Sequence, residues 1–73
     1  MEKLKIYKEY KFKKGGSEFY MTVGDRLKVR LSSGNVIEGT LDYVGNTMEC
    51  FDIYDGEIVT TIDCDDVVDI IPM

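Results

Sequence analysis

The strongest constraint on the fold of this chain is a two-residue alternation of apolar and polar side chains between residues 26 and 71. In "RLKVRL" the apolar Leu27, Val29 and Leu31 share one face, and three basic side chains share the other. This period is typical of half-buried strands. Turn signals interrupt it at "SSGN", "GN", "DG" and "DCDD". The pattern therefore predicts five short strands: 26–31, 36–44, 47–54, 57–62 and 67–71.

These strands predict an all-β protein of one domain. The chain has only 73 residues, and helical periodicity is almost absent. An open sheet this small would leave its edges unpaired, so we expect a small closed barrel of five strands. Gly39 marks a place where a strand bends or another backbone approaches closely. The "DG" at 55–56 predicts a two-residue hairpin turn.

The apolar pattern of the first 23 residues predicts an additional β element. "LKIYKEYKF" fits one strand with Leu4, Ile6, Tyr10 and Phe12 on one face, although Lys8 interrupts that face. "KKGGS" is a turn signal, and "EFYMTV" alternates again. We expect an extra N-terminal strand or hairpin, with a short helix as the alternative. The predicted organisation is a basic extension (1–23) packed on a barrel (24–73).

Charge is divided sharply along the chain. Residues 1–30 contain all nine Lys and Arg and four acids, a net charge of +5. Residues 31–73 contain ten acids and no basic residue, a net charge of −10. A folded domain built from these parts is expected to present one basic and one acidic surface.

The order of residues in 26–71 resembles the Sm-like (LSm/Hfq-type) family of small barrels. The resemblance rests on the first alternating strand, a turn glycine, a G-x-L motif and the residues that follow. The matching positions are Leu27, Val29, Leu31, Gly34, Gly39, Leu41, Val44, Met48, Ile62, Val67 and Ile70. The resemblance implies a five-stranded, SH3-like barrel.

The resemblance fails where that family binds RNA. The residues that form its base pocket are replaced here by Gly45, Glu49 and Asp63. Binding of single-stranded RNA needs positive potential and a stacking platform. Carboxylates at two of the three positions would repel phosphate. We therefore expect the usual RNA pocket to be absent.

The acidic half suggests a protein-docking module instead. The stretch "VRLSSGNVIEGTL" is similar to the Rho-inhibitor (Rof) proteins, acidic Sm-like barrels that block a nucleic-acid-binding surface. By this reading the partner is a protein with a basic face, such as a nucleic-acid-handling protein. The candidate docking residues are Asp63, Asp65, Asp66, Asp69 and Glu49. An aspartate of "DCDD" could also simply cap a 3₁₀ turn. The spacing does not suit a metal site.

The alternative is nucleic-acid binding by the N-terminal half, where lysines alternate with aromatic residues. The candidates are Lys3, Lys5, Lys8, Lys11, Lys13, Lys14, Tyr7 and Tyr10, with Phe12 between them. Aromatic residues at period two often form a core, and lysines often protect an edge strand, so a structural role competes with this hypothesis.

Catalysis has little support in the sequence. Histidine is absent, no nucleophile lies beside a base, and no phosphate-binding glycine loop precedes a helix. We expect no enzyme activity and no cofactor.

The sequence contains no apolar stretch long enough to span a membrane and no signal-peptide pattern, so we expect a cytoplasmic location. In the cytoplasm the two cysteines, Cys50 and Cys64, are expected to be free thiols. A monomer is favoured over a ring joined through strand edges.

Overall fold

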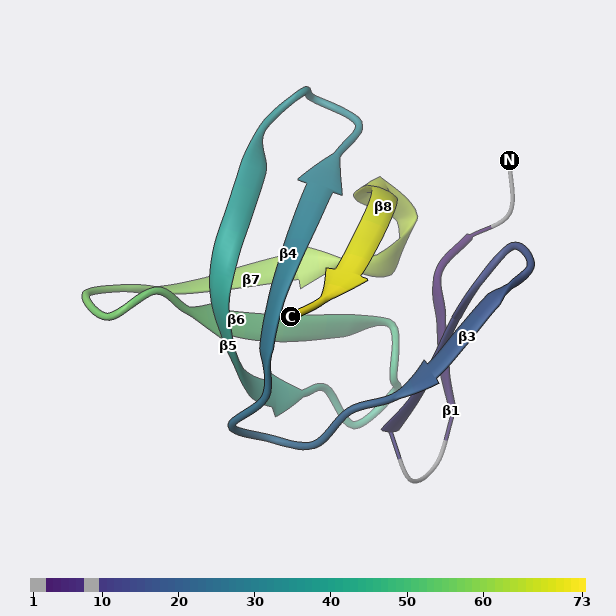
Figure 1. Ribbon diagram of the computed structural model, residues 1–73, viewed down its shortest axis with the longest axis horizontal. Helices are drawn as coiled ribbons and strands as arrows, with labels where there is room; N and C mark the ends of the chain where they lie inside the picture. Colours follow the sequence, from purple (N-terminus) through teal and green to yellow (C-terminus); the bar gives the residue numbers. More distant parts are fainter. Residues whose placement is uncertain (1–2, 8–9) are drawn as a thin grey trace.

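The computed structural model describes residues 3–7 and 10–73, and it confirms an all-β fold. Within these residues, two antiparallel sheets contain eight strands (Figure 1). The strands are β1 (Lys5–Tyr7), β2 (Lys11–Lys14), β3 (Ser17–Tyr20), β4 (Arg26–Leu31), β5 (Val36–Val44), β6 (Cys50–Tyr54), β7 (Val59–Asp63) and β8 (Val67–Pro72). A 3₁₀ helix, η2 (Cys64–Asp66), joins β7 to β8.

The five predicted strands of residues 26–71 form one sheet in the order β7-β6-β5-β4-β8. Although β7 and β8 are consecutive in the chain, they lie at opposite ends of this order. A flat sheet would separate its edge strands by about 19 Å at the usual strand spacing. The three residues of η2 advance only about 6 Å. The sheet must therefore be strongly rolled, which brings its two edges together at η2.

Gly39 and irregular pairing within β5 accommodate this curvature. A Cβ atom at Gly39 would overlap the backbone oxygen of Tyr54 and lie 2.8 Å from Cγ2 of Ile53. The predicted close approach of another backbone is thus present. The register between β5 and β6 shifts between Leu41 and Tyr43, and such a bulge increases local twist.

The N-terminal residues form a separate three-stranded sheet, β1-β2-β3. Of the extra strand or hairpin that the sequence predicted, the hairpin is therefore confirmed. The single strand expected over 4–12 is wrong in detail. β1 ends at Tyr7 and β2 begins at Lys11, and Tyr10 between them has a left-handed φ of 56°. The alternative of a helix is wrong for residues 5–7, which are extended. Lys8 lies outside the described residues.

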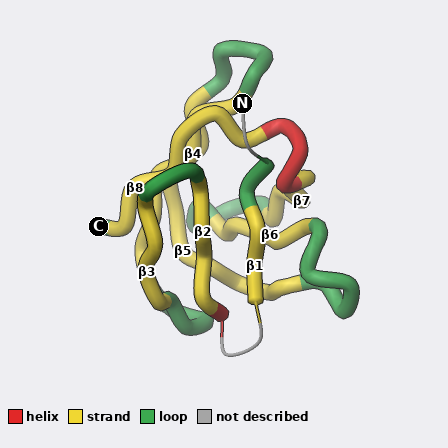
Figure 2. The backbone as a smooth tube through the Cα atoms, turned by 90° about the vertical axis from the view of Figure 1, so that its right-hand side faces the viewer, coloured by secondary structure: helices red, strands yellow, loops and turns green. Residues whose placement is uncertain are grey.

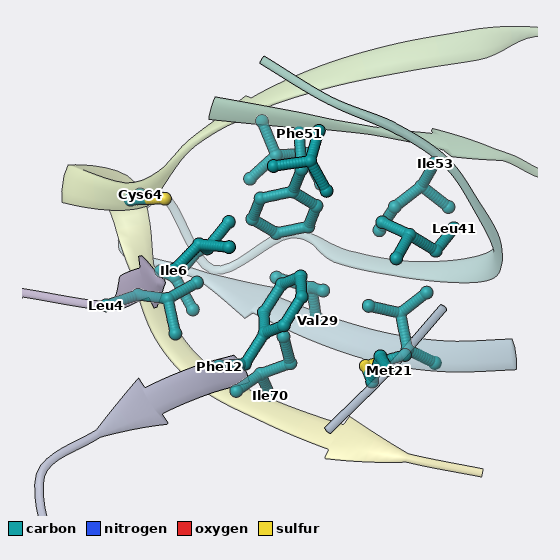
Figure 3. Close-up of a cluster of buried hydrophobic side chains, with 14 residues drawn as sticks. Leu4, Ile6, Phe12, Met21, Val29, Leu41, Phe51, Ile53, Cys64 and Ile70 are labelled. Carbon is teal, nitrogen blue, oxygen red and sulfur yellow. The ribbon is translucent and has the colours of Figure 1, made fainter. Parts of the chain in front are cut away.

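One hydrophobic core joins the two sheets, because the small sheet lies across one side of the rolled sheet (Figures 1 and 2). Phe12 points from β2 towards Phe51 of β6, with ring centroids 5.7 Å apart and planes at 82° (Figure 3). It also stacks on Phe19 at 6.0 Å. The buried apolar residues are Leu4, Ile6, Phe12, Met21, Leu27, Val29, Leu41, Val44, Phe51, Ile53, Ile62, Cys64, Val67 and Ile70.

The predicted boundary at residues 23–24 falls in the turn between the sheets. There the backbone N–H of Thr22 donates to Oδ2 of Asp25 at 2.9 Å. The residues before this turn supply Leu4, Ile6, Phe12 and Met21 to the common core. The small sheet therefore covers apolar side chains that the rolled sheet alone would expose.

The turn between β6 and β7 differs by one residue from the prediction. The backbone N–H of Asp55 donates to the oxygen of Ile58 at 3.2 Å, which leaves Gly56 and Glu57 as the two residues at the tip. Gly56 has a φ of 109°, a conformation that favours glycine. The Asp55 carboxylate accepts hydrogen bonds from the backbone N–H groups of Glu57 and Ile58.

Candidate docking surface

Three of the predicted acidic residues come together around one cation of the same chain. Glu49 lies just before β6, Asp63 ends β7 beside Cys50, and Asp65 lies in η2. The Nζ atom of Lys3 lies 3.7 Å from Oε1 of Glu49 and 3.4 Å from Oδ1 of Asp65. The pattern of lysines and aromatic residues predicted Lys3 on a nucleic-acid surface. The structure instead places it against the acidic residues.

The electrostatic environment of Lys3 shows how closely these carboxylates converge. Its pKa is raised, first by a hydrogen bond and charge interaction with Asp65, and then by the charges of Glu49 and Asp63. The side chains remain accessible, since 38% of Lys3, 67% of Glu49 and 65% of Asp65 is exposed. Water therefore screens these ion pairs, and they contribute little to stability.

Asp63 also has the predicted structural role of a cap. Its Oδ1 atom accepts the backbone N–H of Asp65 at 2.9 Å, while its own backbone is extended. The backbone oxygen of Asp66 accepts the N–H of Ser32 at 2.8 Å, which ties η2 to the end of β4. These bonds hold the acidic side chains of η2 on a fixed backbone.

Cys64 anchors the inner side of η2. Its side chain is fully buried, and its Sγ atom lies 3.9 Å from the backbone oxygen of Met48. Burial raises its pKa to about 11, and the nearby Asp63 charge acts in the same direction. Both cysteines are free thiols. The Cys64 thiol is therefore a packing group and a poor nucleophile near neutral pH.

Asp69 does not join this cluster. It lies on β8 opposite Arg30 of β4, and its Oδ1 atom accepts the backbone N–H of Ile70 at 3.0 Å. Its neighbours on the outer face of the sheet are basic and aliphatic residues. The sequence shows that Asp69 is close to Asp66 along the chain, but the direction of β8 carries it away from η2.

The structure adds Asp52 and two tyrosines that the sequence analysis did not select. On the outer face of β6, Asp52 accepts a hydrogen bond from the Thr61 hydroxyl at 2.8 Å. Its cross-strand neighbour Tyr43 and the next outward residue, Tyr54, are 49% and 42% exposed. The signal was present in "CFDIY", where Phe51 and Ile53 face inwards and leave the alternate residues outside.

We define the acidic face as Glu49, Asp52, Asp63, Asp65 and Asp66. It extends from the outer surface of β6 and β7 to η2. The residues that the Sm-like resemblance equates with an RNA pocket include two of these acids. The third, Gly45, has no side chain, and a Cβ atom there would lie 2.8 Å from Sγ of Cys50.

The alternative nucleic-acid surface is only partly assembled. Strand pairing aligns Lys5 with Lys13, and Lys13 with Glu18, on the outer face of the small sheet. Lys11 lies one row further along the same face, and its Nζ atom lies 3.6 Å from Oε1 of Glu18. An acid therefore lies among these lysines.

The predicted stacking residues are not all available on that surface. Phe12 is fully buried, and Tyr10 packs partly buried against the core. Tyr20, which the sequence analysis missed, is 66% exposed and pairs with Lys11. Lys14 lies at the end of β2 opposite Ser17. The backbone of Tyr7 pairs with that of Lys11, and Lys8 lies outside the described residues.

Within the described residues, no three Cys, Asp or Glu side chains are grouped so that they could hold a metal ion. The described part of the chain also contains no helix of the length and apolar character needed to cross a membrane.

A scan against models of known protein families gives no match. Searches among curated proteins and solved structures give no match either.

Proposed function

We propose that this chain is a non-enzymatic binding module that docks its acidic face on a basic surface of a protein partner. The observation that carries the proposal is the contact of Lys3 with Glu49 and Asp65. Carboxylates from separate segments converge closely enough for one ammonium group to meet two of them. A lysine or arginine of a partner would find the same arrangement.

The tyrosines beside the acidic face suit a cationic partner as well. Tyr43 and Tyr54 expose aromatic surface next to Asp52. Arginine and lysine bind such rings through cation–π contacts worth about 0.5–1 kcal/mol each at exposed sites. Because single exposed ion pairs contribute little, several contacts must act together. Binding is therefore expected to weaken as salt increases.

The class of the partner follows from the negative charge of the acidic face and from the similarity to the Rof proteins. A protein that itself binds nucleic acid carries the basic surface that this acidic face would fit. The similarity of "VRLSSGNVIEGTL" to the Rof proteins points to the same class. Under this proposal the chain competes with nucleic acid for that surface.

A pull-down from lysate of the source cell tests the proposal, with and without RNase. The test variant is Glu49→Gln with Asp65→Asn, which keeps the Asp63 cap. The matched control is Glu18→Gln with Asp42→Asn, two exposed acids outside the acidic face. We expect RNase-resistant capture that falls about tenfold in the test variant, equivalent to about 1.4 kcal/mol. Equal capture by the test variant and its control would contradict the proposal.

Lys3 provides a second and sharper test. Because its ammonium group occupies two acids of the face, Lys3→Gln is expected to tighten partner binding by a few fold. Lys5→Gln, on the outer face of the small sheet, is the matched control. Weaker binding of the Lys3 variant would show that the cation does not compete with the partner.

Nucleic-acid binding is the second candidate function, favoured by the alignment of Lys5, Lys11 and Lys13 beside the exposed Tyr20. Lys11→Glu with Lys13→Glu should abolish binding to single-stranded RNA under this alternative. The same change should leave docking by the acidic face largely intact. Loss of captured partners on RNase treatment would favour this function over the first.

A further inference from the structure

A shallow pocket of about 170 Å³ lies on the outer face of β4, β5 and β8. The strand register explains its lining. Arg30 lies between Val36 of β5 and Asp69 of β8, and Lys28 lies opposite Ile71 in the neighbouring row. The pocket thus combines two cations, one carboxylate and two aliphatic side chains.

The two cations of the pocket remain available to a ligand. Within the part of the chain that the structure describes, neither Lys28 nor Arg30 forms an ion pair, whereas Arg26 lies 3.6 Å from Glu38. Asp69 directs Oδ1 to the N–H of its neighbour.

The aliphatic walls are also accessible. Val36 is 53% exposed and Ile71 is 46% exposed. Together with the two cations, this chemistry suits a ligand that presents a carboxylate immediately beside an aliphatic group.

The tip of the β6–β7 hairpin presents such a pair. Glu57 is exposed, and Ile58 beside it is 61% exposed. The hairpin projects from the body of the molecule, at the left of Figure 1.

Hydrogen bonds fix the shape of this tip. Oδ1 of Asp55 accepts the N–H groups of Glu57 and Ile58 at 2.9 and 3.0 Å. The Tyr54 hydroxyl donates to the backbone oxygen of Gly56 at 2.9 Å. A preorganised tip loses little conformational entropy on binding.

We propose that the pocket receives the Glu57–Ile58 tip of a second copy of this chain. The Glu57 carboxylate meets Arg30 and Lys28, and Ile58 packs against Val36 and Ile71. The two surfaces differ, so the association is head-to-tail. It involves neither the acidic face nor the small sheet, and it does not depend on the proposed function.

The size of the contact sets the expected strength. A hairpin tip in a pocket of this volume buries less than the roughly 1,200 Å² of a stable interface. A dissociation constant on the order of 100 μM is therefore expected. The chain would be monomeric at low micromolar concentration, as the sequence analysis favours, and would associate when concentrated.

Sedimentation equilibrium from about 10 μM to about 1 mM tests the proposal, since this range spans the expected dissociation constant. The wild-type mass should rise with concentration from that of the 8.3 kDa monomer. Arg30→Glu and Glu57→Arg should each remain monomeric, because pocket and tip then carry the same charge. An equimolar mixture of these two variants should associate, because the unchanged pocket of Glu57→Arg meets the unchanged tip of Arg30→Glu, and the acidic pocket of the second meets the basic tip of the first.

Two controls carry matching charge changes elsewhere. Asp42→Arg and Lys13→Glu should associate like the wild type. A wild-type chain that stays monomeric throughout the range would overturn the proposal. So would association that survives both single changes, or a variant mixture that stays monomeric. If inorganic phosphate or a foreign acidic peptide shifts the NMR signals of Lys28 and Arg30 while the mass stays monomeric, the pocket serves another ligand and the proposal is wrong.

Discussion

The small sheet and the β6–β7 side of the rolled sheet contribute to one core but carry opposite charges on their outer faces. The small sheet turns Ile6 and Phe12 inwards and lysines outwards. The β6 and β7 strands of the rolled sheet turn Phe51 and Ile62 inwards and Asp52 and Asp63 outwards. Charge along this chain therefore specifies surfaces, whereas the period-two apolar pattern specifies the core.

The N-terminal region before the turn at residues 23–24 has a structural role as well as a basic charge. A basic N-terminal extension suggests an arm that reaches for a ligand. Here the same residues cover the core, since Phe12 lies between Phe19 and Phe51. Lys3 also contacts the acidic face. The small sheet is therefore a structural layer that covers one side of the core.

The largest expected effect is at the contact between the sheets. Phe12→Ala should destabilise the protein by about 3–5 kcal/mol, because it removes a fully buried ring from the shared core. Urea denaturation measures the change, and the milder Phe12→Leu extends the test if the alanine variant does not fold. Tyr20→Ala, on the outer face of the same sheet, should cost far less. Similar costs for the alanine variants at residues 12 and 20 would mean that the small sheet is not part of the core.

A smaller effect is expected where the rolled sheet is most curved. Gly39→Ala should cost about 1–3 kcal/mol, because the added methyl group overlaps the backbone of Tyr54. Gly16→Ala in the small sheet is the control, since nothing lies within 4 Å of a Cβ atom there. Thermal melts of both variants measure the difference. A Gly39 variant as stable as the control would refute the close approach of β5 and β6.

The cap of η2 is expected to contribute about 1 kcal/mol. Asp63→Ala removes the acceptor of the Asp65 N–H, whereas Asp66→Ala removes an exposed carboxylate in the same helix. The second change should stay within about 0.5 kcal/mol of the wild type. If chemical denaturation gives the two variants equal stability, Asp63 has no capping role.

The smallest effect concerns pH and the hairpin tip. Hydrogen bonds from the N–H groups of Ile58 and then Glu57 lower the pKa of Asp55 below its ordinary value of 3.8. A carboxyl group whose pKa is lower in the folded state stabilises the fold above its unfolded pKa. That contribution is lost as pH falls through the folded value. The difference in melting temperature between wild type and Asp55→Asn should therefore shrink below about pH 4. A gap that stays constant from pH 6 to pH 2 would argue against this role.

The sequence predicted the rolled sheet well, because burial on one face of a strand enforces the alternation seen at Leu27 and Val29. It predicted the N-terminal strands less well. The left-handed backbone of Tyr10 separates β1 from β2, and a non-glycine residue gives little sequence signal for that conformation. The shift of the hairpin tip from Asp55–Gly56 to Gly56–Glu57 depends on pairing between strands.

The candidate site was predictable from the sequence only in part. Glu49, Asp63 and Asp65 were identified from the sequence, because they lie in the part of the chain that has ten acids and no basic residue, and because Glu49 and Asp63 replace residues of the Sm-like RNA pocket. Their contact with Lys3 joins segments far apart in the chain and depends on how the two sheets pack. The separate position of Asp69 depends on the pairing of β8 with β4. Neither the contact of Lys3 with these acids nor the separate position of Asp69 can be predicted from the neighbouring residues in the sequence.

Native-state hydrogen exchange measured by NMR tests the claim that the two sheets form one cooperative core. The decisive amides are those of Phe12 and Phe19 in the small sheet and of Val29 and Phe51 in the rolled sheet. If the sheets form one unit, the slowest amides of both exchange through the same global opening and report the same free energy. Exchange of the small-sheet amides through a separate opening of much lower free energy would contradict the claim, because the first 23 residues would then be an appendage.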